Sequence, residues 1–289
     1  MASVVIAAHN EANVIGRCLD ALAAQRFAGP VEIVVSANGC TDDTAVVAAR
    51  PGVTVIDRPE AGKAAALDAA DRVATGFPRI YLDADIVVPP HALATLLARF
   101  DVLPRPLAVV PRRRVATTGR PWPVRAYFSI NERHPAFRAG LFGRGMIVLS
   151  ELGRGRFDTF PAAIADDLFL DSRFAAAEKA EVSEVEVVVE APRTTRDLLR
   201  RLVRVRRGNA QLRAAADAGE LDLPVRPADR WAWLREVVLR DPRRAPAAVP
   251  YLVITVAAAL LARRPAKAGD AWGRDDSTRT PSSAEGTPT

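Results

Sequence analysis

The sequence predicts an α/β fold in which a mostly parallel, Rossmann-like sheet is flanked by helices. Over the first hundred residues, short apolar runs alternate with helical patterns, and this alternation favours parallel strands covered on both faces. Polar clusters follow directly after several of the apolar runs, where sheets of this kind bind their ligands. The chain has 289 residues, of which 49% are hydrophobic, so it is long enough for one large domain or two small ones.

The expected elements follow one another closely along the chain. The first strand covers Val4–Ala8, and the helix over Ala12–Gln25 has one apolar face, made by Val14, Ile15, Cys18, Leu19 and Leu22. Further strands are expected at Val31–Ser36, Val53–Ile56, Ile80–Leu82 and Val185–Val189, and further helices at Thr44–Ala49, Gly62–Val73, Leu168–Phe174, Thr194–Ala218 and Arg230–Arg240. Pro111–Tyr127 is rich in arginine and proline, and we expect a loop or flexible arm there.

Three of the expected strands end in polar clusters. His9-Asn10-Glu11 follows the first strand, Asn38 to Asp43 follow the second, and Asp83-Ala84-Asp85 follows the fourth. Side chains two residues apart in an extended chain point to the same side, so the two carboxylates of the last cluster can converge. Such a pair suits Mg²⁺ or Mn²⁺, which completes its coordination with water and substrate phosphates. The clusters therefore predict a site for a polar, phosphate-bearing ligand.

Charge and cysteine content indicate which partners and which cellular location suit the protein. The net charge of +6 fits an anionic partner, such as a nucleotide, a nucleic acid or an acidic membrane surface. Cys18 and Cys40 lack the spacing of a zinc site, and two reduced thiols are typical of a cytoplasmic protein. The N-terminus starts directly into a strand-like run without the pattern of a signal peptide, which also favours a cytoplasmic location.

The C-terminal part of the chain holds an apolar segment of 17 residues, Pro246–Ala262, between the pairs Arg243-Arg244 and Arg263-Arg264. A helix that spans a membrane needs about 20 apolar residues. Two interpretations stay open: a helix packed on the protein, and a helix that is embedded in a membrane or contacts its cytoplasmic face. We expect a main domain over residues 1–222, a C-terminal helical region over 223–264, and a disordered Ser/Thr/Pro/Gly-rich tail over 265–289.

Five motifs resemble those of family 2 glycosyltransferases, and they occur in the same order over roughly residues 3–210. They are Val5–Glu11, Ser36–Thr44, Gly62–Leu67, Asp83-Ala84-Asp85 and Ala165–Leu168. The resemblance implies a GT-A fold, here with a C-terminal helical extension. It also implies a hexosyltransferase of class EC 2.4, which moves a sugar from a nucleoside diphosphate to an acceptor hydroxyl with inversion. Such an enzyme would serve glycan, polysaccharide or cell-envelope biosynthesis.

The resemblance further implies which residues form the site. The donor nucleotide would be bound by the residues that match the family's pocket: His9, Asn10, Glu11, Asn38, Lys63, Asp83, Arg204 and Arg207. Asp85, together with Asp83, would hold Mn²⁺ or Mg²⁺. Asp167 matches the family's catalytic base, and Asp166 takes the place of the usual glutamate before it.

Two positions depart from the family pattern. Asn38 stands where many members have a base-contacting aspartate, and the base stays open because an amide both donates and accepts hydrogen bonds. Of the family's Gln-x-x-Arg-Trp motif, the chain keeps Arg204, with Arg207 as a nearby substitute. The incomplete motif weakens any inference to processive polymer synthesis.

Other functions remain as alternatives. A retaining glycosyltransferase of the same fold would differ in the stereochemistry of its product. A non-catalytic protein that binds polyanions or lipid would use the arginine-rich helix, although the paired carboxylates would repel a nucleic acid, so none is expected as a partner. A sugar-phosphate nucleotidylyltransferase would carry a glycine-rich loop after the first strand, where this chain has His9-Asn10-Glu11, and no P-loop motif is present in the sequence.

Overall fold

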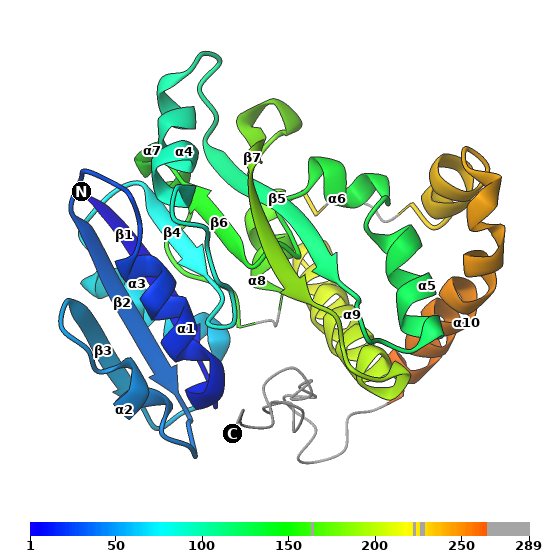
Figure 1. Ribbon diagram of the computed structural model, residues 1–289, viewed down its shortest axis with the longest axis horizontal. Helices are drawn as coiled ribbons and strands as arrows, with labels where there is room; N and C mark the ends of the chain where they lie inside the picture. The colour runs from blue at the N-terminus through cyan, green and yellow to red at the C-terminus, as the bar shows by residue number, and fades with distance from the viewer. Residues whose placement is uncertain (163–164, 222–223, 226–228, 265–289) are drawn as a thin grey trace, which may run out of the picture.

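Figure 1 shows a computed structural model of the chain, which describes residues 1–162, 165–221, 224–225 and 229–264. Within these residues, seven strands form one sheet in the order β3-β2-β1-β4-β6-β5-β7. Helices cover both faces of this sheet (Figure 1). The expectation of an α/β fold with flanking helices is therefore confirmed.

The N-terminal half of the sheet is parallel throughout. Its elements are β1 (Ala2–Ala8), α1 (Ala12–Ala23), β2 (Val31–Asn38), α2 (Thr44–Ala48), β3 (Val53–Arg58), α3 (Lys63–Val73) and β4 (Arg79–Leu82). β1 pairs in parallel with β2 on one side and β4 on the other, so the carboxyl ends of these three strands meet at one edge of the sheet. The buried residues of α1 are the five that its apolar periodicity predicted.

The C-terminal half adds one antiparallel strand. Its elements are α4 (Ala92–Ala98), β5 (Ala108–Ala116), α5 (Trp122–Asn131), α6 (Pro135–Ala139), β6 (Met146–Leu149), α7 (Glu151–Arg154), α8 (Asp166–Ser172), β7 (Lys179–Glu190), α9 (Thr195–Asp217) and α10 (Ala245–Ala262). Strand β6 runs antiparallel to both β4 and β5, whereas β5 and β7 are parallel. The sheet is thus mostly parallel, as expected.

The expectation of a loop at Pro111–Tyr127 is wrong. Most of this stretch belongs to β5 and to the start of α5. Strand β5 pairs with β7 along its whole length, and an irregularity in register between Pro111 and Arg112 accommodates the proline. Arg114 Nε lies 2.7 Å from a carboxylate oxygen of Glu186 on β7, so the arginines that suggested a loop take part in cross-strand ion pairs.

Two smaller differences concern the later elements. The strand expected at Val185–Val189 is longer and covers Lys179–Glu190. The short helix expected at Arg230–Arg240 contains a π-helical turn over Leu234–Val238. The expected domain boundary after residue 222 and the tail 265–289 lie outside the described residues.

The apolar core lies in layers around the sheet. Val4 and Ile6 of β1 pack with α1 and α4 on one face, and Val5 packs with α3 and α8 on the other. A third cluster joins α5, α9 and α10, where the rings of Tyr127 and Tyr251 stack with their centroids 5.0 Å apart. This third cluster lies at the end of the molecule opposite β3 (Figure 1).

Candidate active site

The ends of β1 and β2 are tied to each other by polar contacts. His9 Nδ1 lies 2.6 Å from the carbonyl oxygen of Asn38. Asn10, in a left-handed backbone conformation with φ of 52°, accepts a hydrogen bond from the backbone N–H of Thr41 at 2.8 Å. The N–H of Glu11 donates to Thr44 Oγ1 at 2.7 Å. The first two sequence motifs therefore form one connected surface at the carboxyl edge of the sheet.

Asn38 connects this surface to the start of α3. Its side chain is buried; Nδ2 donates to the carbonyl of Ala8 at 2.7 Å, and Oδ1 accepts from the N–H of Gly62 at 3.0 Å. Both ends of the amide thus serve backbone groups. An aspartate could replace only the acceptor half of this arrangement, which gives a structural reason for asparagine here. Contact of Asn38 with a nucleotide base stays a prediction.

Lys63, the first residue of α3, joins the third, fourth and fifth motifs. Its ammonium nitrogen lies 3.0 Å from Asp83 Oδ1 and 2.9 Å from Asp166 Oδ2. Burial by itself would lower the pKa of Lys63, but the carboxylates of Asp166, Asp83 and Asp167 raise it well above its ordinary value. The lysine therefore stays charged within an acidic cluster, and residues far apart in the sequence meet at one point.

Asp167 lies beside this cluster at the start of α8. Its Oδ2 accepts a hydrogen bond from the N–H of Gly143 at 2.9 Å. Burial and the neighbouring charge of Asp166 raise the pKa of Asp167 to about 7. A carboxylate that titrates near neutral pH is suited to accept a proton from a hydroxyl group.

The turn after β4 packs closely against the loop Gly143-Arg144-Gly145, which precedes β6 and which we call the glycine loop. The N–H of Asp83 donates to the carbonyl of Gly145 at 2.8 Å. Gly145 has φ of 69°, and a Cβ atom there would come within 2.5 Å of the Ile86 side chain. Glycine is therefore required by both conformation and space. From the sequence, Gly143-Arg144-Gly145-Met146 suggests either a loop near the donor sugar or acceptor or an ordinary turn, and the structure places this loop against the turn that carries Asp83.

Two arginines to which the sequence assigned no individual role hold this glycine loop in place. Arg113 of β5 donates to the carbonyl of Gly143 at 3.3 Å and lies over the ring of Phe137. Arg144 is buried, donates to the carbonyl of Pro111 at 2.8 Å and pairs with Glu181 of β7 at 2.6 Å. Because both depend on the pairing of β5 with β7, a sequence stretch taken for a loop could not reveal them.

The two carboxylates after β4 differ in exposure. Asp83 is half-buried and Asp85 is exposed. Burial and the negative charges of Asp85, Asp83 and Glu11 raise the pKa of the Cys18 thiol to about 12. In the described part of the chain, no group of three or more His, Cys, Asp or Glu side chains is arranged to hold a metal ion. Two carboxylates fit an ion that takes its other ligands from phosphate and water.

One small cavity collects the predicted residues of the later motifs. It is lined by Ala7, Lys63, Leu67, Tyr81, Leu82, Asp83, Gly145, Met146, Ile147, Asp166, Asp167 and Leu170. Arg204 is half-buried on α9 and does not belong to this lining. Arg207 is also on α9, and its side chain donates to the carbonyl of Arg264, just after the C-terminal end of α10, at 3.0 Å. The structure therefore brings Lys63 and the acidic residues together, but not these two arginines.

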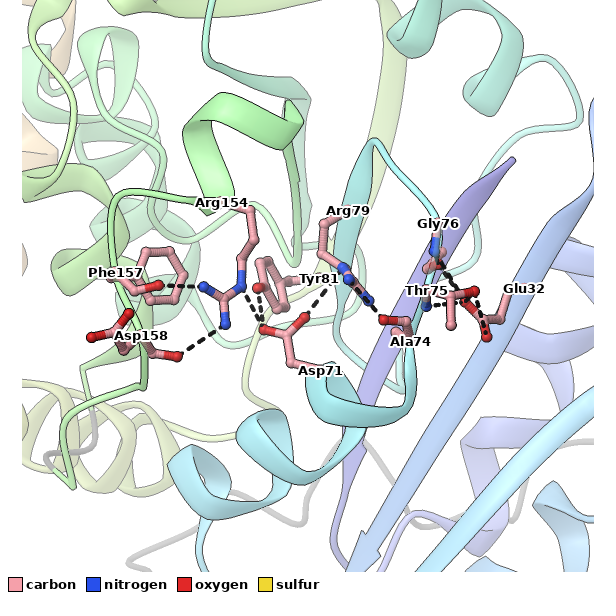
Figure 2. Close-up of polar contacts among 11 residues, drawn as sticks. Glu32, Asp71, Ala74, Thr75, Gly76, Arg79, Tyr81, Arg154, Phe157 and Asp158 are labelled. Atoms are coloured by element: carbon pink, nitrogen blue, oxygen red, sulfur yellow. Dashed lines mark hydrogen bonds and ion pairs between the residues drawn. The ribbon is translucent and has the colours of Figure 1, made fainter.

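A buried ionic network around Asp71, drawn in Figure 2, reaches the cavity lining through Tyr81. Tyr81, whose side chain belongs to the lining, donates from Oη to Asp71 Oδ2 at 2.5 Å. Asp71 also pairs with Arg79 at 3.2 Å and with Arg154 at 2.9 Å. The network joins α3, β4 and α7, and so fixes the strand that delivers Asp83.

The family model for Glycosyl transferase family 2 matches residues 3–149, which is half of the chain and includes four of the five motifs. The chain belongs to glycosyl transferase family 2. The expected enzyme class, a glycosyltransferase, is thereby confirmed at the level of the family. No curated protein matches the chain.

Solved structures of the same fold extend the likeness beyond residue 149. The mannosyltransferase PcManGT from Pyrobaculum calidifontis, in complex with GDP-Man and Mn²⁺, has a TM-score of 0.57 and 23% identity over 90% of this chain and 78% of that one. S. aureus TarS 1–349 in complex with UDP has a TM-score of 0.52 and 16% identity over 88% of both chains.

Other matches to S. aureus TarS are partial. The alignments cover 36% of the TarS chain in one structure and 58% of the 1–349 chain that holds UDP-GlcNAc. At these identities the likeness establishes the fold, which is the GT-A fold expected from the sequence.

Proposed function

We propose that this family member transfers a sugar from a nucleoside-diphosphate donor to an acceptor hydroxyl, with inversion at the anomeric carbon. The observation that carries the proposal is the ammonium group of Lys63, which lies within 3.0 Å of Asp83 and 2.9 Å of Asp166. Around it lie residues to which the family resemblance assigns nucleotide binding, metal binding and the role of catalytic base. The proposal also covers His9, Asn10 and Glu11 as part of the nucleotide pocket.

The donor diphosphate would be held by positive charge. Asp85 and Asp83 would bind Mn²⁺ or Mg²⁺, and a bound ion stabilises the negative charge that develops on the diphosphate leaving group. PcManGT, whose structure contains both GDP-Man and Mn²⁺, supports a divalent ion in this fold. Lys63 would orient Asp83 and add charge near the phosphates. Arg204 stays a candidate for phosphate binding, whereas the contacts of Arg207 with α10 argue for a structural role.

Asp167 would act as the base. Its carboxylate accepts the proton of the acceptor hydroxyl while the hydroxyl oxygen bonds to the anomeric carbon and the bond to the diphosphate breaks. General base catalysis of this kind contributes typically about 10²–10⁴-fold to the rate. A single base acting in one displacement leads to inversion. Asp166 would support it by holding Lys63 and by keeping the pKa of Asp167 raised.

The proposal extends to the cellular location of the enzyme and to the class of its acceptor. We infer a cytoplasmic enzyme of glycan or cell-envelope biosynthesis, because Cys18 and Cys40 are both free thiols and because the chain is a family 2 member. The acceptor would be a hydroxyl of a glycan, a lipid-linked sugar or a small molecule. Residues 1–222 would form the GT-A domain, and residues 223–264 would form the C-terminal helical region.

Nucleotide and metal binding can be tested by thermal unfolding. We expect one of UDP, GDP, CDP, ADP or TDP to raise the melting temperature with Mn²⁺ or Mg²⁺ but not with EDTA. A ligand at 100 times its Kd stabilises the native state by about 2.7 kcal/mol. Asp85→Asn should lose the metal-linked shift, whereas Asp101→Asn, at an exposed position in another part of the chain, should keep it. An unchanged shift in Asp85→Asn would refute the metal assignment.

The role of Asp167 can be tested with the same donor. Asp167→Asn should lower transfer by at least about 10²-fold, because the proton has no acceptor, while the thermal shift with donor and metal is retained. NMR of the anomeric configuration of the product gives the stereochemistry. Full activity of the variant would exclude Asp167 as the base, and a product with retained configuration would favour the alternative of a retaining enzyme.

A further inference from the structure

Helix α10 has one buried face and one exposed face that is entirely apolar. Pro250, Tyr251, Ile254 and Ala258 are buried, where the helix packs on α5 and α9. On the other side lie five large apolar side chains, each between 46% and 66% exposed, which we call the outer face: Val249, Leu252, Val253, Val256 and Leu260. Their spacings of three and four residues place them in one stripe along the helix.

This outer face is more apolar than the surface of a helix in water normally is. An 18-residue window within Pro242–Ala262 has a mean hydropathy of 2.0, yet only 22% of that window is buried, whereas a core helix of similar composition would be mostly buried. No Asp, Glu, Lys or Arg occurs between Ala245 and Ala262. Contiguous exposed apolar patches of this kind mark surfaces that bind a partner or a membrane.

Arginines lie at both ends of the outer face. Arg240 and Arg243 precede the helix, Arg263 and Arg264 follow it, and all four are exposed. An apolar stripe between clusters of guanidinium groups is complementary to a bilayer surface that contains anionic headgroups. A second copy of the chain would fit less well, because placing two such faces against each other brings arginine clusters of like charge together.

We propose that the outer face of α10 docks on an anionic membrane surface, with the helix lying in the plane of the membrane. A spanning orientation conflicts with the packing on the other side of the helix. There Tyr251 stacks on Tyr127 of α5, and Arg207 of α9 donates to the carbonyl of Arg264. A spanning α10 would either lose these contacts or draw the arginine-rich α9 into hydrocarbon, which is costly. Docking in the plane leaves them intact.

The docking surface can be tested by sedimentation of the whole protein with lipid vesicles. We expect binding to vesicles of phosphatidylcholine and phosphatidylglycerol, and several-fold weaker binding to phosphatidylcholine alone. Combined Leu252→Gln, Val253→Gln and Val256→Gln should weaken binding by roughly tenfold or more, since buried apolar area drives insertion. The matched control is Leu103→Gln with Leu152→Gln, which changes side chains that are 78% and 77% exposed in other parts of the molecule and should have no effect.

The contribution of charge is measured separately. Arg263→Gln with Arg264→Gln should weaken binding to the anionic vesicles by roughly fivefold for each arginine at low salt. Equal melting temperatures show that the variants are folded, because all the changed side chains are exposed. The assay contains neither donor nor acceptor, so its result is independent of the proposed transfer reaction.

Three outcomes would overturn the proposal. The first is wild-type protein that stays in the supernatant with both kinds of vesicle. The second is a triple variant that binds as tightly as the wild type. The third is a wild-type dimer, seen by analytical ultracentrifugation, that binds no vesicles and becomes monomeric in the triple variant; that result would assign the outer face to a second copy of the chain.

Discussion

Lys63 and Asp167 differ in how their environment changes their acid–base behaviour. Both lie in the same cluster, and burial disfavours the charged form of each. For Lys63 the surrounding carboxylates outweigh burial and raise its pKa, so it remains an ammonium group. For Asp167 burial and Asp166 act in the same direction and bring its pKa to about 7. The cluster thereby combines a permanent positive charge with a carboxyl group that can exchange a proton near neutral pH.

This raised pKa predicts the pH dependence of transfer. Because the folded enzyme protonates Asp167 below about pH 7, kcat/KM should fall about tenfold for each pH unit below that value and level off above it. Initial rates at low donor concentration between pH 5 and pH 9 measure the profile, and donor affinity over the same range separates binding from catalysis. A flat profile down to pH 5 with unchanged affinity would contradict the role of Asp167 as base.

Strand β4 illustrates how an element depends on contacts outside itself. It has only four residues, Arg79–Leu82, and yet delivers Asp83 and Asp85 to the site. Parallel pairing with β1 and antiparallel pairing with β6 fix its position in the sheet. Beneath it, Asp71 is the shared partner of Arg79, Tyr81 and Arg154 (Figure 2). This buried carboxylate holds α3, β4 and α7 in one arrangement.

Loss of this shared charge should be costly for stability. Asp71→Asn leaves Arg79 as a buried guanidinium without its counter-ion, and we expect a loss of about 3–5 kcal/mol in the free energy of unfolding. The matched control is Asp20→Asn, which breaks an ion pair with Arg50 in which the Asp20 side chain is 70% exposed, and should cost less than about 1 kcal/mol. Urea unfolding measures both, and similar values for the two variants would count against the importance of the network.

The whole molecule consists of a sheet with a helical region packed at one end. The third apolar cluster draws Tyr127 from α5, Leu198 from α9, and Tyr251 and Ile254 from α10. Arg207 adds hydrogen bonds from α9 to the last carbonyls of α10, which a helix cannot satisfy internally. The C-terminal region therefore packs on the body of the protein through one face of α10, and we expect the two to unfold together.

This coupling can be measured with two neighbouring residues of α10. Tyr251→Ala removes a ring that stacks on Tyr127 and contacts Trp233, so we expect a loss of about 3–5 kcal/mol and a single unfolding transition at lower temperature. Leu252→Ala, next in the chain but on the outer face, should change stability by less than about 0.5 kcal/mol. Calorimetry that resolved a separate transition for α10 would show instead that the helix is an independent unit.

Local pattern was enough to predict the parallel half of the sheet and the edge at which the motifs gather. Alternating apolar runs predicted β1 to β4 with bounds that differ by a few residues, since each strand and helix carries its own periodicity. The rule that ligands bind at the carboxyl ends of parallel strands then predicted that polar residues after β1, β2 and β4 would meet. Five ordered motifs carried the family assignment.

Contacts between distant residues were decided only by the tertiary structure. The arginines of β5 suggested a loop because their acidic partners, such as Glu186, lie about seventy residues further on in β7. The family pattern predicts a base contact at position 38, and the structure adds that the amide of Asn38 binds the backbone of Ala8 and Gly62. The phosphate contact of Arg207 stays a prediction, and the structure adds that the side chain donates from α9 to the carbonyl of Ala262 at the end of α10. Periodicity reports which face a residue occupies along its own element, whereas the partner of a polar group depends on how separate elements pack.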